Sequence, residues 1–242
     1  MPKKKPQIFM WSRERDHLLA RHDFYMEQVK ARVLRSFDNM EEEAEQIDDE
    51  LYERLAAFDS EGGDMTARAE IARHDGMEFF LLLCHMKTQT TLGALASLYH
   101  QWEKDFRGFM QRQQILVRNN GNEEKDYFWH CETRELFDAL ESFGWSIRES
   151  KIYQSLESCR LIVNVYKHGK GPSLESLIEY FPQYLKGRLS GSAESSLLGS
   201  SRHEDLAVTE EQFDQIGEGI RQFWRDFPSR LVLVTDPDTD RT

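Results

Sequence analysis

Residues 65–117 are the segment that most constrains how this chain folds. Their apolar residues recur at steps of three and four, the spacing of a helix face. One straight helix over this tract would be roughly 80 Å long at about 1.5 Å per residue. That length predicts a kink near Gly76 or Gly93, or a helical hairpin formed with residues 13–58. The apolar positions include Phe79, Leu82, Leu83, Met86, Leu92, Leu95, Leu98, Tyr99, Trp102, Phe106, Phe109 and Met110.

The rest of the chain also carries helical patterns. Residues 13–58 have the same periodicity, with a break expected at Asn39 and a turn at Asp59–Gly63. Four shorter helices are expected over 134–143 (capped by Thr133), 147–168, 174–181 (capped by Ser173) and from the Thr209–Gln212 capping box to about Phe227. Residues 231–234 are a candidate short strand with no obvious partner. The predicted fold class is therefore all-α.

The helical patterns suggest three regions. The first is a basic N-terminal tail with a long acidic helical extension, the second is a helical bundle that contains a flexible Gly/Ser-rich loop, and the third is a short tail. Their expected bounds are 1–62, 65–227 (loop 187–202) and 228–242.

Charge is distributed unevenly along the chain. The 242 residues include 31 Lys and Arg against 43 Asp and Glu, a net charge of −12. Residues 38–64 hold twelve acids and one base, whereas residues 145–190 hold seven bases and four acids. A polyanion responds to the local field, so the acidic total does not exclude a nucleic-acid ligand. The acidic run is interpreted as a solvated helix face, with a partner-binding surface as the alternative.

Several classes of protein are not expected. The sequence contains no run of 18 apolar residues, so no membrane span is predicted. The basic segment around Lys3–Lys5 is not followed by the apolar stretch of a secretory signal. Three scattered cysteines (Cys84, Cys131 and Cys159) fit reduced thiols in the cytoplasm. The sequence has no glycine-rich phosphate-binding loop, and its His and Cys residues do not have the spacing typical of metal ligands. No cofactor and no metal are therefore predicted.

The helix expected over 147–168 carries the strongest candidate site. Arg160, Asn164 and His168 are four residues apart, so they share one helix stripe. Glu157 lies one turn earlier on that stripe, and Lys167 precedes the histidine. Lys170 follows in the Gly169–Pro172 segment that ends the helix. The stripe therefore ends on an imidazole at a helix C-terminus.

These side chains suit the cleavage of RNA without a metal ion. A histidine can accept a proton from a ribose 2′-OH or donate one to the leaving 5′-oxygen. An arginine can hold a phosphate at two points and stabilise its growing negative charge. One histidine is too few for both proton transfers, so two copies of the helix meeting across a two-fold axis would supply the pair.

Around this stripe the chain resembles the HEPN domains, the "higher eukaryotes and prokaryotes nucleotide-binding" family. The match is closest to a bacterial subgroup with the pattern Arg-x3-Asn-x2-Lys-His-Gly, and it is specific over 157–171. Arg160 and His168 take the positions of the family's Arg and His. Seven residues separate them, and Leu161 rather than a polar residue follows the arginine, so the polar role passes to Asn164. The Leu98–Glu103 stretch and the late Phe223-Trp224 helix also resemble this subgroup.

The resemblance, which covers about 65–227, implies an all-α HEPN-like bundle with a long, coiled-coil-like N-terminal extension. It implies a metal-independent endoribonuclease of the toxin or anti-phage type, with a composite site between two protomers and a 2′,3′-cyclic phosphate product. Arg160 would bind the scissile phosphate and His168 would act as acid or base. Asn164, Lys167, Glu157 and Lys170 would support them. The expected partners are RNA, a second copy of the chain and an antitoxin or defence-complex protein.

Two other functions remain open. The first alternative is a non-catalytic helical subunit that docks a partner through its long helices and acidic face. A small-nucleotide sensor using the same Arg160, Lys167 and His168 is the third interpretation.

Overall fold

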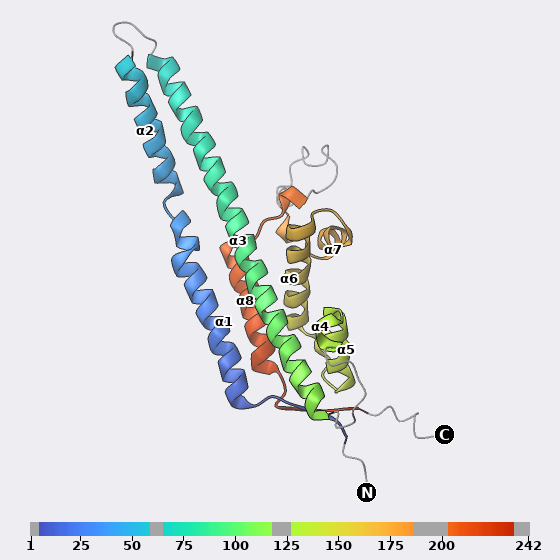
Figure 1. The fold of residues 1–242 in the computed structure, drawn as a ribbon. Helices are drawn as coiled ribbons and strands as arrows, with labels where there is room; N and C mark the ends of the chain where they lie inside the picture. The colour runs from blue at the N-terminus through green and yellow to red at the C-terminus, as the bar shows by residue number, and fades with distance from the viewer. Residues whose placement is uncertain (1–4, 59–64, 118–126, 186–202, 235–242) are drawn as a thin grey trace. The chain divides into compact units, whose positions relative to one another are not determined.

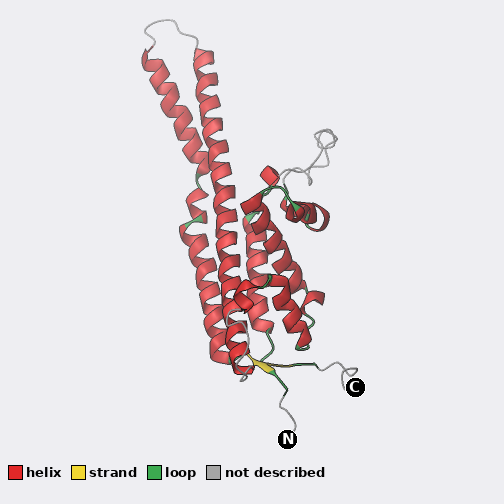
Figure 2. Cartoon of the chain, turned by 45° about the vertical axis from the view of Figure 1, so that its right-hand side comes forward, coloured by secondary structure: helices red, strands yellow, loops and turns green. Residues whose placement is uncertain are grey.

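The computed structural model describes residues 5–58, 65–117, 127–185 and 203–234, and it has an all-α fold. Figures 1 and 2 show these helices and one small pair of strands. None of the described helices is both long enough and apolar enough to cross a membrane. The helices are α1 (Ser12–Arg32), α2 (Met40–Phe58), α3 (Met65–Val117), α4 (Tyr127–His130), α5 (Thr133–Ser142), α6 (Lys151–His168), α7 (Pro172–Tyr180) and α8 (Glu210–Asp226). The strands are β1 (Gln7–Phe9) and β2 (Arg230–Val232).

The chain divides into two compact units. The first contains Met1–Met26 and Leu95–Thr242, and the second contains Glu27–Ala94. The cuts fall inside α1 and α3, because the start of α1 packs within the first unit. There Arg21 pairs with Asp105 at 2.9 Å, and Asp23 accepts a 2.7 Å bond from Arg221. The predicted regions 1–62, 65–227 and 228–242 stay a prediction.

An aromatic core holds the first unit together. Phe106 of α3 lies 5.0 Å from Phe223 of α8 and 5.9 Å from Phe137 of α5, measured between ring centroids. Trp102 lies 5.4 Å from Phe223, and all these side chains are buried. Aromatic pairs at these separations add attraction beyond the burial of their area. The core therefore fixes α3 against α5 and α8.

Helix α6 packs against α8 and α7 in the same unit. A Cβ atom at Gly219 of α8 would lie 2.3 Å from Ser155 Cβ of α6, a distance that real atoms do not adopt. Glycine therefore permits the two backbones to approach closely. Ser150 caps the start of α6 by accepting a bond from the Tyr153 N–H, and Gly169 ends the helix with φ of 69°.

The small sheet supplies a partner for the candidate strand at residues 231–234. β2 pairs antiparallel with β1, with Ile8 opposite Leu231 (Figure 2). The partner strand lies at the other end of the chain, where three residues give too short a pattern for period-two alternation to be recognised.

Two helix starts differ from the expected ones. The sequence predicts Thr133 as the cap of α5, but the cap is Glu132, which forms a capping box with Glu135. Thr133 is the first helical residue. Helix α7 begins at Pro172 rather than after Ser173, with Gly171 as its cap. Proline suits this first position because its missing N–H would have no helical partner. The Thr209 capping box of α8 is present as predicted.

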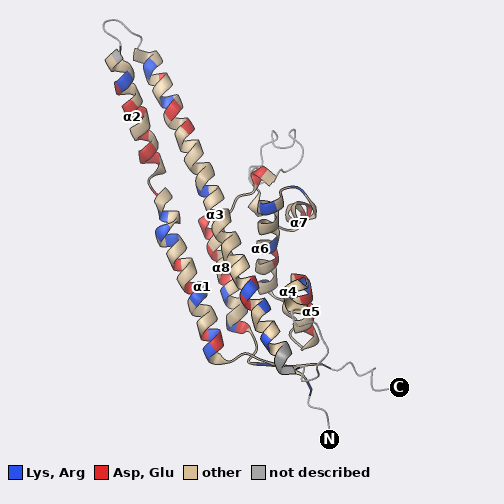
Figure 3. Ribbon diagram, viewed as in Figure 1, with Lys and Arg blue, Asp and Glu red and all other residues tan. Residues whose placement is uncertain are grey.

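The second unit contains α2, the 3₁₀ turn Leu34–Phe37 and the first part of α3. α2 starts directly after Asn39, the expected break, and α3 is one helix through Gly76 and Gly93. A Cβ at Gly76 would lie 3.0 Å from the Ala44 carbonyl oxygen, so small residues let α2 and α3 pack closely. Acidic residues are concentrated on α2 (Figure 3). The predicted turn at 59–63, the loop 187–202 and both chain ends lie outside the described residues.

Candidate functional site

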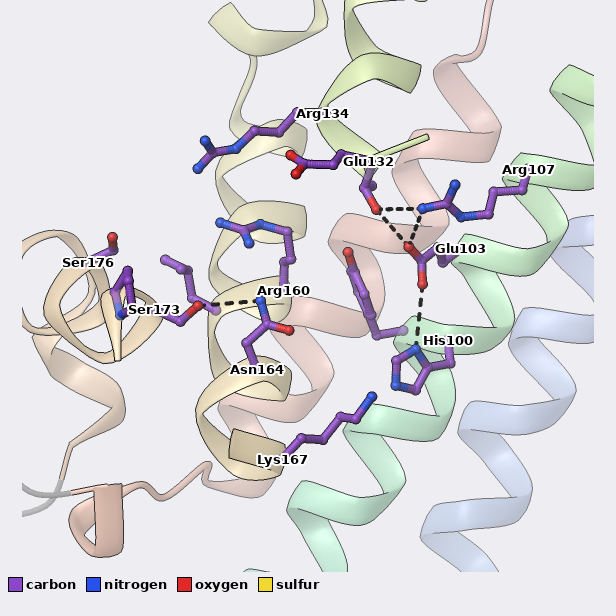
Figure 4. Close-up of a pocket in the computed structure, with 14 residues that line it drawn as sticks. His100, Glu103, Arg107, Glu132, Arg134, Arg160, Asn164, Lys167, Ser173 and Ser176 are labelled. Atoms are coloured by element: carbon purple, nitrogen blue, oxygen red, sulfur yellow. Dashed lines mark hydrogen bonds and ion pairs between the residues drawn. The ribbon is translucent and has the colours of Figure 1, made fainter. Parts of the chain in front are cut away.

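A polar pocket of about 510 Å³ lies in the first unit between α3, the start of α5, α6 and α7 (Figure 4). The residues that line it are Tyr99, His100, Glu103 and Arg107 from α3; Glu132, Thr133 and Arg134 from the start of α5; Arg160, Leu161, Asn164 and Lys167 from α6; and Pro172, Ser173 and Ser176 from α7.

The pocket face of α3 follows from its sequence. His100, Glu103 and Arg107 are spaced by three and four residues, which places them on one side of the helix. Trp102 and Phe106 lie on the other side and are buried in the aromatic core. The core therefore directs the polar stripe of α3 into the pocket.

A carboxylate is fixed at the centre of this stripe. Glu103 Oε1 accepts hydrogen bonds from Thr133 Oγ1 at 2.6 Å and from Arg107 Nη2 at 2.9 Å. Arg107 Nη1 in turn donates to the carbonyl oxygens of Phe128 and Cys131 at 2.7 and 2.8 Å. Burial alone would raise the pKa of Glu103, but the bonds from Thr133 and Arg107 outweigh it and lower the pKa. Glu103 is therefore ionised at neutral pH.

The second oxygen of this carboxylate faces an imidazole. His100 Nδ1 lies 3.6 Å from Glu103 Oε2 (Figure 4). A carboxylate on Nδ1 favours a proton on that nitrogen, which leaves Nε2 as the atom available to a ligand. The His100 side chain is 37% exposed, so a ligand in the pocket can reach it.

Arg160 of α6 is held by the preceding turn. Its Nε and Nη2 donate to the two carboxylate oxygens of Glu157 at 2.8 and 2.6 Å. These bonds raise the pKa of Arg160 further above its ordinary value. Arg134 Nη2 lies 3.9 Å from the same carboxylate. Glu157 therefore orients Arg160 and offsets part of the positive charge that Arg160 brings to the pocket.

Asn164 and Lys167 complete the α6 side. Asn164 Nδ2 donates a 3.4 Å bond to Ser173 Oγ, which links α6 to α7 (Figure 4). The Lys167 side chain is exposed and is directed toward the ring of His100 in Figure 4. An ammonium, an amide and an imidazole thus face the same space.

The predicted site residues are only partly brought together. Arg160, Asn164 and Lys167 line the pocket, and Glu157 contacts it through Arg160. His168 is the exposed last residue of α6, one turn beyond Asn164, and is not among the lining residues. Lys170 is exposed in the segment that follows and is not a lining residue either.

The pocket carries a positive local charge in an acidic protein. Its lining contributes four permanent cations and two carboxylates, against a chain total of −12. This surplus, with hydroxyl and amide donors beside it, suits an anionic ligand such as a phosphate. The cations are Arg107, Arg134, Arg160 and Lys167, and the carboxylates are Glu103 and Glu132.

Sequence reasoning missed the contribution of α3. On the sequence alone His100 is interpreted as an ordinary histidine and Glu103 as a packing residue, yet both line the pocket. The signal was available, since a polar stripe at 100, 103 and 107 interrupts a helix whose neighbouring positions are aromatic. That α6 faces this stripe could not be read from the pattern.

Comparison of the chain with protein-family models, curated proteins and solved structures finds no match. The resemblance to HEPN domains therefore stays a prediction that depends on the residues of the α6 segment and of Leu98–Glu103.

Proposed function

We propose that this protein is a metal-independent endoribonuclease of the toxin or defence type, acting on RNA in the cytoplasm. One observation carries the proposal. Basic groups of α6 converge in a single pocket with His100 of α3, whose imidazole is oriented by an ionised carboxylate. A phosphate-binding group beside a positioned acid or base is the combination that RNA cleavage requires.

In the proposed reaction the RNA phosphate binds beside Lys167 and Arg160. His100 Nε2 accepts the proton of the ribose 2′-OH, and the 2′-oxygen attacks the adjacent phosphorus. The bond from phosphorus to the 5′-oxygen breaks, leaving a 2′,3′-cyclic phosphate on one fragment. The leaving 5′-oxygen takes a proton from the imidazolium of His168, which follows the lining residue Lys167 at the end of α6, so the scissile phosphate is placed at this end of the pocket. Lys167 stabilises the charge that grows on the phosphoryl oxygens.

This assignment changes the source of the second imidazole. The sequence-based hypothesis takes it from a second copy of the chain, whereas His100 now offers it within one chain. The composite site between two protomers stays a prediction, as does an antitoxin or defence-complex partner.

The test is cleavage of total RNA by the purified protein in excess EDTA, with the fragment ends analysed for cyclic phosphate. His100→Ala and His168→Ala are each expected to lose cleavage by at least about a hundredfold. Helix content should stay unchanged. Lys170→Ala is the matched control, because this exposed residue does not line the pocket. If the unmodified protein leaves the RNA intact, the proposal is refuted.

One observation favours a non-catalytic alternative. The bidentate pair of Arg160 with Glu157 already satisfies two of the guanidinium donors within the chain. On that view the pair is structural and the protein is a helical interaction subunit of a toxin–antitoxin or defence complex. RNA that stays intact, together with tight binding to the product of a neighbouring gene, would support this alternative.

A further inference from the structure

Trp129 of α4 is a large aromatic residue that lies outside the aromatic core. It is 46% exposed, whereas Trp102 and Trp224 are buried. Its indole edge lies against α3 at Gly108, where a built Cβ atom would be 3.9 Å from Trp129 Cζ2. The ring therefore rests on α3 by its edge and presents apolar surface to solvent beside that helix.

Arg107 holds Trp129 next to the pocket of the candidate site. Arg107 lines that pocket, and its Nη1 donates a 2.7 Å hydrogen bond to the carbonyl oxygen of Phe128, directly before Trp129. The same nitrogen donates at 2.8 Å to the carbonyl oxygen of Cys131, which precedes the lining residue Glu132. One guanidinium therefore fixes the backbone on both sides of Trp129 against the pocket wall.

A stripe of α3 leads from the pocket to the indole. His100, Lys104 and Gly108 follow one another at four-residue steps, and each step advances about 6 Å along the helix and turns about 40° around it. This stripe is on the accessible side of α3, since Trp102 and Phe106 are buried on the opposite side. Lys104 is exposed. A ligand that leaves the pocket along α3 therefore reaches the ring of Trp129.

Cations lie before and after the indole on this path. Arg112 continues the stripe one step beyond Gly108, and its Nη1 would lie 3.4 Å from the Cβ atom built at Gly108. Its Nη2 pairs with Glu14 of α1, which offsets part of its charge. Lys and Arg residues are visible along this end of α3 in Figure 3. A basic track with an aromatic ring beside it is the combination that binds single-stranded nucleic acid.

We propose that Trp129 stacks on one base of a single-stranded RNA whose scissile phosphate is bound in the pocket, an assignment that rests on the proposed function. His100 and Gly108 are eight residues apart in the chain, about 12 Å along α3. At the ~3.4 Å per nucleotide of a stacked strand, this separation corresponds to roughly three or four nucleotides. The substrate class is therefore single-stranded RNA of at least that length. Little preference among bases is expected at this position, because every base has a flat face.

Binding of 2′-O-methyl oligoadenylates tests this subsite in the full-length protein without cleavage, because methylation removes the attacking hydroxyl. An octanucleotide can extend from the pocket to Trp129, whereas a dinucleotide cannot. Trp129→Ala and Trp129→Leu are each expected to weaken octanucleotide binding about fivefold to a hundredfold. Trp129→Phe should bind nearly as tightly as the unmodified protein, because a flat ring remains. All these variants should keep the unmodified affinity for the dinucleotide and for an octanucleotide backbone without bases.

Tyr180→Ala is the matched control, since Tyr180 is an exposed aromatic residue at the last position of α7. Unchanged octanucleotide binding by Trp129→Ala, or an equal loss for the backbone without bases, would overturn the stacking subsite while leaving the pocket and its reaction in place. If the unmodified protein binds neither oligonucleotide, the subsite and the proposed function are both wrong.

Discussion

Glu103 Oε2 lies 3.6 Å from His100 Nδ1, while Oε1 of the same carboxylate is held by Thr133 and Arg107. The carboxylate therefore cannot turn away from the imidazole without breaking two other hydrogen bonds. The bond from Thr133 also joins the start of α5 to α3, so the groups that orient His100 stabilise the fold of the pocket as well.

Glu103→Gln is expected to lower RNA cleavage by about tenfold to a hundredfold, less than the roughly 10²–10⁴ that a positioned acid or base contributes. The amide keeps the shape of the side chain but removes the charge that orients the imidazole. Single-turnover rates measured against pH should show a shifted profile, while the affinity for uncleaved RNA stays the same. An unchanged profile would contradict a positioning role for Glu103.

The pKa of Glu103 also predicts how stability depends on pH. Because this pKa is lower in the folded than in the unfolded chain, the carboxylate contributes stability above the ordinary glutamate pKa of about 4.3. That contribution is lost as the pH falls through the folded value. Urea unfolding from pH 7 downward should therefore show the unmodified chain losing its advantage over Glu103→Gln in acid. If the difference in unfolding free energy between the two proteins stayed constant with pH, Glu103 would not be held as a carboxylate by Thr133 and Arg107.

Gly219→Ala is expected to destabilise the first unit by about 1–3 kcal/mol. The new methyl group would overlap Ser155 Cβ, which is fixed to the backbone of α6 and cannot rotate away. Gly108→Ala is the matched control in α3, since its nearest neighbour would be the end of the flexible Arg112 side chain at 3.4 Å. Urea unfolding should leave that control neutral or slightly stabilised, by up to about 1 kcal/mol. Equal losses in both variants would show that α6 and α8 do not pack this closely.

Lys167→Gln is expected to weaken RNA binding and to reduce its salt dependence. Each cation that neutralises a phosphate of a single strand contributes about 0.7 to the slope of log affinity against log salt. Lys170→Gln should leave the slope unchanged, because Lys170 does not line the pocket. Both lysine substitutions are made in the His100→Ala protein, so that RNA affinity can be measured from low to physiological salt without cleavage. An equal decrease of this slope in the two variants would show that RNA is attracted by the general surface charge and not bound in the pocket.

The helices could be predicted because their periodicity is long and their caps are local. The α3 pattern extends over tens of residues, and the Thr209 box is formed by neighbours in the chain. The β1–β2 pair and the capping role of Glu132 could not be predicted in the same way. The first depends on contacts between the two chain ends, and the second on a residue type that rarely caps a helix.

The residues of the candidate site could also be predicted only where the signal is local in the sequence. Arg160, Asn164 and Lys167 could be found because one helix stripe holds them. The polar stripe of His100 and Glu103 is visible in the sequence, but its place in the site could not be predicted. That place arises from the packing of α3 beside α6, which the aromatic core and the contact of Gly219 with Ser155 determine. Tertiary packing decides which histidine enters the pocket, whereas helical spacing alone favours His168.

The measurement that tests the central claim most directly compares the unmodified protein with His100→Ala on one defined RNA in EDTA, with cyclic phosphate ends quantified over time. The account predicts metal-free cleavage by the unmodified protein and a loss of at least about a hundredfold in the variant, with equal binding of uncleaved RNA. Cleavage by His100→Ala at the unmodified rate would contradict it.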